Sequence, residues 1–124
     1  MNKKNILIID DDEDFCKLVK KNIEQSGEFV VYIAINGEDG VKLARGVKPD
    51  LILLDIVMPE MDGTDVASLI KNDKDIKDTP IVFLTAMVRE EEADSQASLT
   101  MGYSLLAKTV TVGELITCIR KNIR

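Results

Sequence analysis

Short runs of apolar residues, each of strand length, recur five times along the chain. They lie at residues 6–9, 29–35, 51–54, 81–84 and 105–107. Most are continuous rather than alternating with polar residues, which is typical of parallel strands that are covered on both faces. The pattern therefore predicts five buried strands.

Segments with helical spacing of apolar residues separate these runs. We expect helices over about 13–26, 41–46, after Gly63, over about 88–100 and from about 112 onward, and Gly27 is a typical stop for the first. The helix over 88–100 has the thinnest apolar face. The expected apolar positions of the first helix are Phe15, Leu18, Val19 and Ile23, and those of the third are Val66, Leu69 and Ile70.

Strand and helix alternate along the whole chain, and this order predicts the fold class. We expect a doubly wound, five-stranded parallel sheet of order 2-1-3-4-5 with five helices, a three-layer α/β/α arrangement of the flavodoxin-like kind. A chain of 124 residues suffices for one core of ordinary size. We therefore expect a single domain over 1–124, with no output domain in this chain.

Charge and composition exclude several functions. The formal net charge is −6, and there is no His. Without imidazole, Ser-His and Cys-His nucleophile pairs, His-ligated zinc and phosphohistidine carriers are excluded. An acidic chain without a basic run is also a poor candidate for direct nucleic-acid binding, which needs clustered Lys and Arg.

Cysteine content and hydropathy indicate the compartment. Cys16 and Cys118 are too few and too far apart for a secreted disulfide scaffold. The apolar runs are far too short to span a membrane, and the N-terminus does not have the pattern of a signal peptide. We expect a cytoplasmic protein with no membrane insertion.

Polar residues whose side chains could bind a ligand or take part in a reaction follow four of the five predicted strands directly. They are Asp10 and Asp11 after the first strand, Asp55 after the third, Thr85 after the fourth and Lys108 after the fifth. Singly, Thr85 fits a capping residue and Lys108 a solvated surface lysine. In such sheets ligands bind beyond the carboxyl ends of the strands. Because all of these polar residues follow a strand end, we expect them to form one site.

The charges of this set indicate the ligand. Asp10, Asp11 and Asp55 sum to −3, and Lys108 reduces this to −2, so that one divalent cation neutralises the cluster. Hard oxygen ligands with this charge suit Mg²⁺, which retains several waters and takes few protein carboxylates.

Four segments, ILIIDDDEDF, PDLILLDIVMPEMDG, IVFLTA and LLAK, resemble the receiver domain of two-component response regulators. The resemblance covers nearly the whole chain. It implies that Asp55 is the phosphoacceptor and that Asp10 and Asp11 hold Mg²⁺ together with Asp55 and the backbone carbonyl of Val57. It further implies that Thr85 follows the phosphoryl group and that Lys108 pairs with it.

The resemblance also implies the partners. A sensor histidine kinase or a phosphotransfer protein would supply the phosphoryl group, so the chain would be a phosphoacceptor rather than a classical enzyme. The signal would pass to a downstream protein or to an output domain absent from this sequence. The face formed by the fourth helix, fifth strand and fifth helix would serve a homodimer.

Departures from the family pattern surround the lysine. Thr109 stands where the family has Pro, and Leu105 where it has an aromatic residue; Tyr103 lies two positions earlier and is expected to project differently. Since a cis bond before a residue other than Pro costs about 2.5–4 kcal/mol, we expect a trans Lys108–Thr109 bond with the lysine still directed at the acids.

Two alternative functions follow. One is a pseudo-receiver that acts only as a protein-interaction module. The other, a haloacid-dehalogenase-like phosphatase, needs a second acid where Val57 stands.

Overall fold

The computed structural model describes residues 2–86 and 103–123. Its elements are β1 (Lys4–Ile9), α1 (Glu13–Glu24), β2 (Phe29–Ala34), α2 (Gly37–Val47), β3 (Leu51–Asp55), α3 (Gly63–Lys71), β4 (Ile81–Thr85), β5 (Ser104–Ala107) and α5 (Val112–Asn122). All five strands are parallel and their order is β2-β1-β3-β4-β5, as predicted. The helix expected over 88–100 lies outside the described residues.

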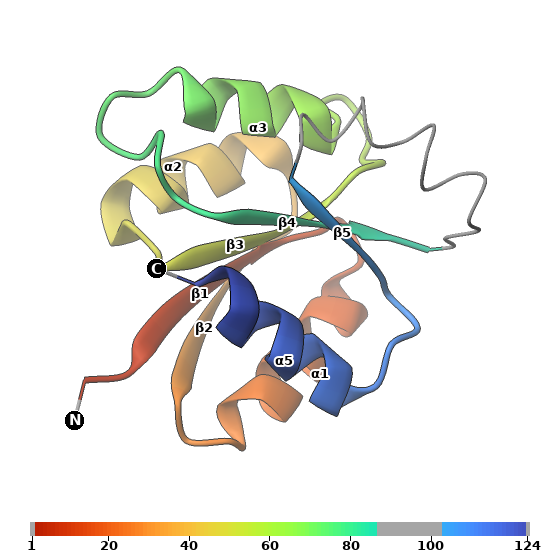
Figure 1. The fold of residues 1–124 in the computed structure, drawn as a ribbon. Coiled ribbons are helices and arrows are strands. Elements are labelled where there is room, and N and C mark those ends of the chain that lie inside the picture. Colours follow the sequence, from red (N-terminus) through yellow and green to blue (C-terminus); the bar gives the residue numbers. More distant parts are fainter. Residues whose placement is uncertain (1, 87–102, 124) are drawn as a thin grey trace.

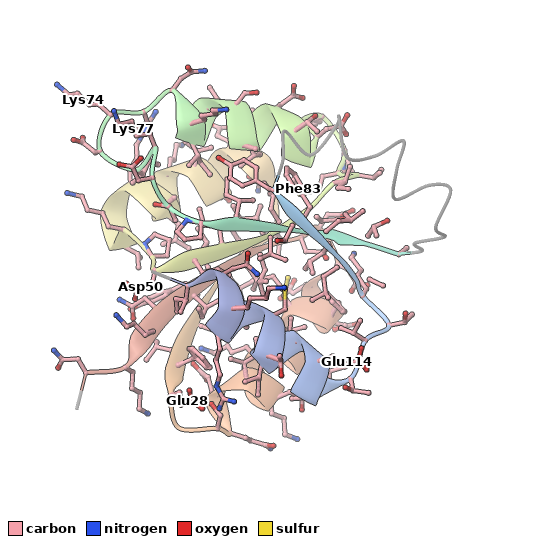
Figure 2. The ribbon with its side chains drawn as sticks, in the orientation of Figure 1. Glu28, Asp50, Lys74, Lys77, Phe83 and Glu114 are labelled. Carbon is pink, nitrogen blue, oxygen red and sulfur yellow. The ribbon has the colours of Figure 1, made fainter. Side chains whose placement is uncertain are left out.

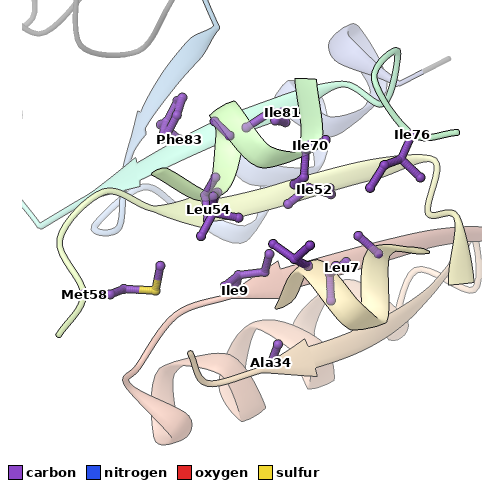
Figure 3. Close-up of a cluster of buried hydrophobic side chains, with 14 residues drawn as sticks. Leu7, Ile9, Ala34, Ile52, Leu54, Met58, Ile70, Ile76, Ile81 and Phe83 are labelled. Carbon is purple, nitrogen blue, oxygen red and sulfur yellow. The ribbon is translucent and has the colours of Figure 1, made fainter. Parts of the chain in front are cut away.

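The sheet is the middle of three layers, with α2 and α3 on one face and α1 and α5 on the other (Figure 1). Successive strand residues point to opposite faces. In β1, Leu7 and Ile9 therefore enter the core beneath α2 and α3, whereas Ile6 and Ile8 enter the core beneath α1 and α5. Figure 3 shows the first of these cores, in which β1, β3 and β4 meet α3. The continuous apolar runs are thus explained by burial on both faces.

The loops at the carboxyl end of the sheet are built tightly. Asp12 caps α1 by accepting the Phe15 backbone N–H at 3.1 Å, and Asp62 begins α3 with a capping box. The backbone of Gly63, which follows this cap, lies close to that of Asp55. A Cβ at position 63 would lie 2.2 Å from the carbonyl oxygen of Asp55. Glycine at this position lets the start of α3 pack directly behind the last residue of β3.

Two helical faces differ from the sequence prediction. Leu18 is 57% exposed and Leu69 is 43% exposed, although both were expected in the core. Cys16 and Ala67 are buried instead. The buried stripe of each helix is narrower than its apolar stripe, because each helix contacts the sheet along one line only.

Charged side chains cover the outer surface, and Lys74 and Lys77 project outward from the loop after α3 (Figure 2). Ion pairs on this surface join distant segments: Arg120 of α5 binds Glu28, which precedes β2, and Arg45 of α2 binds Asp73, which follows α3. Within the described part of the chain, no helix has both the length and the apolar character needed to cross a membrane.

The outer edge of the sheet at β2 is protected by a pair of charges on α1. Glu24 Oε2 accepts the backbone N–H of Val31 at 2.9 Å, and Lys20 Nζ donates to the Val31 carbonyl oxygen at 2.7 Å. The two side chains also bond each other at 3.0 Å. Both hydrogen-bonding groups of an edge residue are therefore occupied, which hinders pairing with another strand.

Replacing Glu24 by Ala is expected to lower the free energy of unfolding by about 1–2 kcal/mol, because the Val31 N–H loses its acceptor. Urea unfolding measures this change. Glu24→Gln is the matched control, since it keeps an acceptor oxygen without the charge and is expected to recover most of the loss. Equal stability of the Ala variant and the unmodified chain would contradict the role assigned to the pair.

Candidate functional site

Three carboxylates meet beyond the carboxyl ends of β1 and β3. Asp10 follows β1, Asp55 ends β3, and the register pairs Ile9 with Leu54, so the two acids lie side by side. One oxygen from each of Asp10, Asp11 and Asp55 lies within 4.8 Å of the others. Asp10 is fully buried and Asp55 is 6% exposed, whereas Asp11 faces solvent. The structure thus brings together the acids that the sequence predicted.

Local hydrogen bonds hold Asp10 in place. Its Oδ1 accepts the Asp12 backbone N–H at 3.0 Å, and its carbonyl oxygen accepts the Cys16 thiol at 3.4 Å. Burial, with the Asp10 charge next in importance, raises the pKa of Cys16 to about 12. The thiol therefore stays protonated and acts as a donor.

Lys108 is the cation of the site. Its Nζ lies 2.7 Å from Asp10 Oδ2 and 3.5 Å from Asp55 Oδ2. Its backbone N–H donates to the carbonyl oxygen of Thr85 at 2.8 Å, which fixes the chain as it leaves β5. Among the described residues no peptide bond is cis. The Lys108–Thr109 bond is therefore trans and Lys108 is directed at the acids, so both predictions for this segment are confirmed.

The pocket carries an excess of negative charge. Burial and, next in importance, the Asp10 carboxylate together raise the pKa of Asp55 to about 7, although Lys108 offsets part of the effect. For Lys108, burial lowers the pKa, but the pairing with Asp10 and Asp55 outweighs this and places it above its usual value. A second cation would relieve the remaining repulsion.

The donor set fits a small divalent cation. Asp10 Oδ2 is buried and lies against the Lys108 ammonium, yet no donor in the described ranges reaches it with hydrogen-bond geometry. It therefore keeps a lone pair for a metal ion. Together with Asp11 and Asp55 it offers only hard oxygen ligands, which Mg²⁺ prefers.

The remaining predicted site residues lie at the same edge of the sheet. Thr85 is the last residue of β4, half-buried, and pairs with Ala107 of β5. Val57 lies in the loop between β3 and α3, and its side chain is 76% exposed. Their positions match the prediction, while their roles stay predictions.

The direction of the Tyr103 side chain, next to β5, differs from the sequence prediction. Tyr103 and Leu105 pack against the same core cluster, on the side of α2 and α3. The expectation that Tyr103 would project differently was wrong, because positions two apart along a strand share a face. The Tyr103 ring lies 6.1 Å from that of Phe83, measured between centroids.

Sequence reasoning did not identify one neighbour of the site. Lys108 Nζ lies over the ring of Phe15, 4.9 Å from its centroid. The sequence indicated only an apolar helix position for Phe15. The one available signal was its place in the first turn after the acidic residues.

Comparison with known proteins agrees with this geometry. The family model for the response regulator receiver domain matches residues 6–120. The chain belongs to this family. It is a phosphoacceptor signalling module of the two-component type, with an acidic pocket of Asp10, Asp11 and Asp55 beside Lys108.

Curated relatives are transcriptional regulators. The alkaline phosphatase synthesis transcriptional regulatory protein PhoP of Bacillus subtilis (strain 168) is 41% identical over 102 residues, which are 82% of this chain and 40% of PhoP. The DNA-binding dual master transcriptional regulator RpaA of Synechocystis is 35% identical over 96% of this chain and 48% of RpaA. The chain thus spans less than half the length of either relative.

Solved structures show the same fold. The N-terminal domain of a response regulator receiver protein from Methanoculleus marisnigri JR1 is 30% identical, with a TM-score of 0.75 over 97% of this chain and 96% of that one. Chemotaxis protein CheY4 of Vibrio cholerae has a TM-score of 0.86 over 98% of this chain and 100% of its own. Its identity is 21%, so this likeness concerns the fold.

Proposed function

We propose that this receiver accepts a phosphoryl group on Asp55 and that the modified domain signals through altered protein contacts. The observation that carries the proposal is the position of the Lys108 ammonium, 2.7 Å from Asp10 and 3.5 Å from Asp55. It places a fixed positive charge beside the carboxylate that would receive the phosphoryl group. Such a charge stabilises the equatorial oxygens during transfer.

The reaction is a displacement at phosphorus. An oxygen of the Asp55 carboxylate forms a bond to phosphorus while the bond from phosphorus to the donor's imidazole nitrogen breaks. The electron pair of that bond stays on the imidazole, and the product is an aspartyl phosphate. The raised pKa of Asp55, about 7, indicates that the nucleophile is more basic than an ordinary carboxylate.

Asp10, Asp11, Asp55 and the Val57 carbonyl would hold Mg²⁺. The ion would neutralise charge on the phosphoryl oxygens when bound. Thr85, at the end of β4, would donate its hydroxyl to the transferred group. Lys108 would pair with a second oxygen, and its contact with Asp10 keeps it at the pocket meanwhile.

The family implies a histidine kinase as the donor, and we propose either the kinase itself or a phosphotransfer protein, acting in the cytoplasm. PhoP and RpaA are named as transcriptional regulators and are more than twice as long as the segments matched here. This supports an output domain or a separate downstream protein as the target. The receiver itself would contact no nucleic acid, and a homodimer would use the face that includes β5 and α5.

Incubation with acetyl phosphate and MgCl₂, followed by intact mass spectrometry, tests the proposal. The expected result is one added phosphoryl group, dependent on Mg²⁺. Beryllofluoride is expected to shift the amide NMR signals of the residues around Asp55. A pseudo-receiver would give neither an adduct nor a response to beryllofluoride, and that combined result would overturn the proposal.

The phosphorylated state is expected to have a half-life of minutes or longer. Val57 is 76% exposed beside the acceptor and, being apolar, is unable to orient an attacking water. Val57→Asn is expected to accelerate loss of the phosphoryl group about two- to tenfold, the effect of one added hydrogen bond. The decay of the adduct after acetyl phosphate is removed measures this rate, with Val57→Ala as the matched control. Loss within seconds from the unmodified chain would contradict the prediction.

A further inference from the structure

We propose that Phe15 is a positioning residue, whose ring holds the Lys108 ammonium beside the acidic pocket through a cation–π contact. The proposal rests on the proposed function in one respect, namely that the position of Lys108 matters for phosphoryl transfer. The observation behind it is the location of Lys108 Nζ over the ring, 4.9 Å from the centroid. Such contacts act within about 6 Å.

The ring is placed by the same segment that supplies two of the acids. Asp10 and Asp11 follow β1 directly, Asp12 caps α1, and the N–H that this cap accepts belongs to Phe15. The backbone at Phe15 is therefore fixed relative to the pocket. A ring at this position in the first turn has a defined location relative to Asp10.

The lysine stem lies in apolar surroundings. A small cavity of about 80 Å³ between α1, α5 and β5 is lined by Lys108 together with Phe15, Leu106, Val110 and Leu115. The Lys108 side chain is only 19% exposed. Partial exclusion of water strengthens the attraction between an ammonium group and the face of a ring.

The ring differs from the other partners of Lys108 in one property. Asp10 and Asp55 also supply oxygens that a divalent cation would bind, so a bound metal ion would share these carboxylates with the lysine and weaken their hold on it. A lysine side chain has a flexible four-carbon stem, so that without a further contact it is free to move into solvent. Phe15 has no metal-binding atom, so its contact persists when the carboxylates are occupied.

Replacement of Phe15 by fluorinated phenylalanines of increasing fluorine content tests the contact, because fluorine weakens the ring quadrupole with little change of shape. The initial rate of phosphoryl incorporation from acetyl phosphate in MgCl₂ is expected to fall stepwise, by about 3- to 20-fold in total. Phe15→Leu is expected to match the fully fluorinated ring, and Phe15→Tyr to retain the rate. The same fluorinated residues at Phe29, buried at the opposite end of the sheet, serve as the control.

A second readout does not depend on phosphorylation. In the unmodified chain the ring current of Phe15 is expected to shift the ε-methylene protons of Lys108 upfield, and Phe15→Leu is expected to remove this shift. A chain that takes up no phosphoryl group yet shows the shift would refute the proposed function and leave the contact standing. An unshifted Lys108 signal, or a rate that falls with Leu but not with fluorination, would overturn the cation–π assignment.

Discussion

Replacing Asp55 by Asn is expected to abolish phosphoryl uptake and, in metal-free buffer near pH 7.5, to stabilise the fold by about 1–3 kcal/mol. Asn has nearly the same shape but lacks the nucleophilic oxyanion. It also removes one of three carboxylates whose oxygens lie within 4.8 Å of one another. Loss of the nucleophile removes activity, whereas loss of a repelling carboxylate raises stability.

The sign of the stability change follows from the pKa. Burial and the Asp10 charge raise the pKa of Asp55 from 3.8 to about 7 in the folded chain. The folded state therefore holds this proton more tightly than the unfolded state, and its stability falls as pH rises from about 4 to about 7. A shift of this size sets an upper limit of about 4 kcal/mol. This limit already includes the ion pair with Lys108, because Lys108 lowers the pKa of Asp55 against the effect of burial.

Thermal melts without Mg²⁺ at several pH values measure the effect. The melting temperature of Asp55→Asn is expected to exceed that of the unmodified chain by about 3–10 °C at pH 7.5, with little difference at pH 4.5. Asp78→Asn, on the exposed surface, is the control for loss of one negative charge. A lower melting temperature for Asp55→Asn at pH 7.5 would show that repulsion is not the dominant interaction in the pocket.

Replacing Lys108 by Met is expected to destabilise the metal-free chain by about 2–4 kcal/mol, because a buried charge loses its partner. The ammonium is the ion-pair partner of Asp10, which is fully buried, and of Asp55. Met keeps most of the apolar stem. Mg²⁺ is expected to recover much of the loss, since a bound cation supplies the missing charge and stabilises the state that binds it.

Urea unfolding with and without MgCl₂ measures this exchange of one cation for another. Lys74→Met, in the exposed loop after α3, removes a charge far from the pocket and is expected to change stability by less than about 0.5 kcal/mol. A Lys108→Met variant that is as stable as the unmodified chain without metal would show that the ion pair contributes nothing. If Mg²⁺ did not reduce the stability loss of Lys108→Met, the ion would not bind beside Asp10 and Asp55.

The fold followed from the sequence because its main signal, continuous apolar runs, has one physical cause. Residues such as Leu53 and Leu54 are both buried although they face opposite ways, and this occurs only in a strand covered on both sides. Helix faces were less predictable. Leu18 and Leu69 fit the apolar period yet are exposed, because the period does not report how wide the contact with the sheet is.

The acidic pocket also followed from the sequence, since the carboxyl ends of parallel strands meet at one edge. Contacts that depend on side-chain direction did not. The Phe15 ring of α1 contacts Lys108, which follows β5, and the Lys20–Glu24 pair of α1 bonds the backbone of Val31 in β2. No periodicity connects such residues, and only the packing of α1 against the sheet brings them together.

Chemical location of the phosphoryl group is the direct test of whether Asp55 is the phosphoacceptor. After incubation with acetyl phosphate and MgCl₂, borohydride reduces an aspartyl phosphate to homoserine, and peptide mass spectrometry locates the changed residue. We expect homoserine at position 55, and none there without Mg²⁺ or in Asp55→Asn. Modification at another acid with Asp55 intact, or no modification at all, would contradict it.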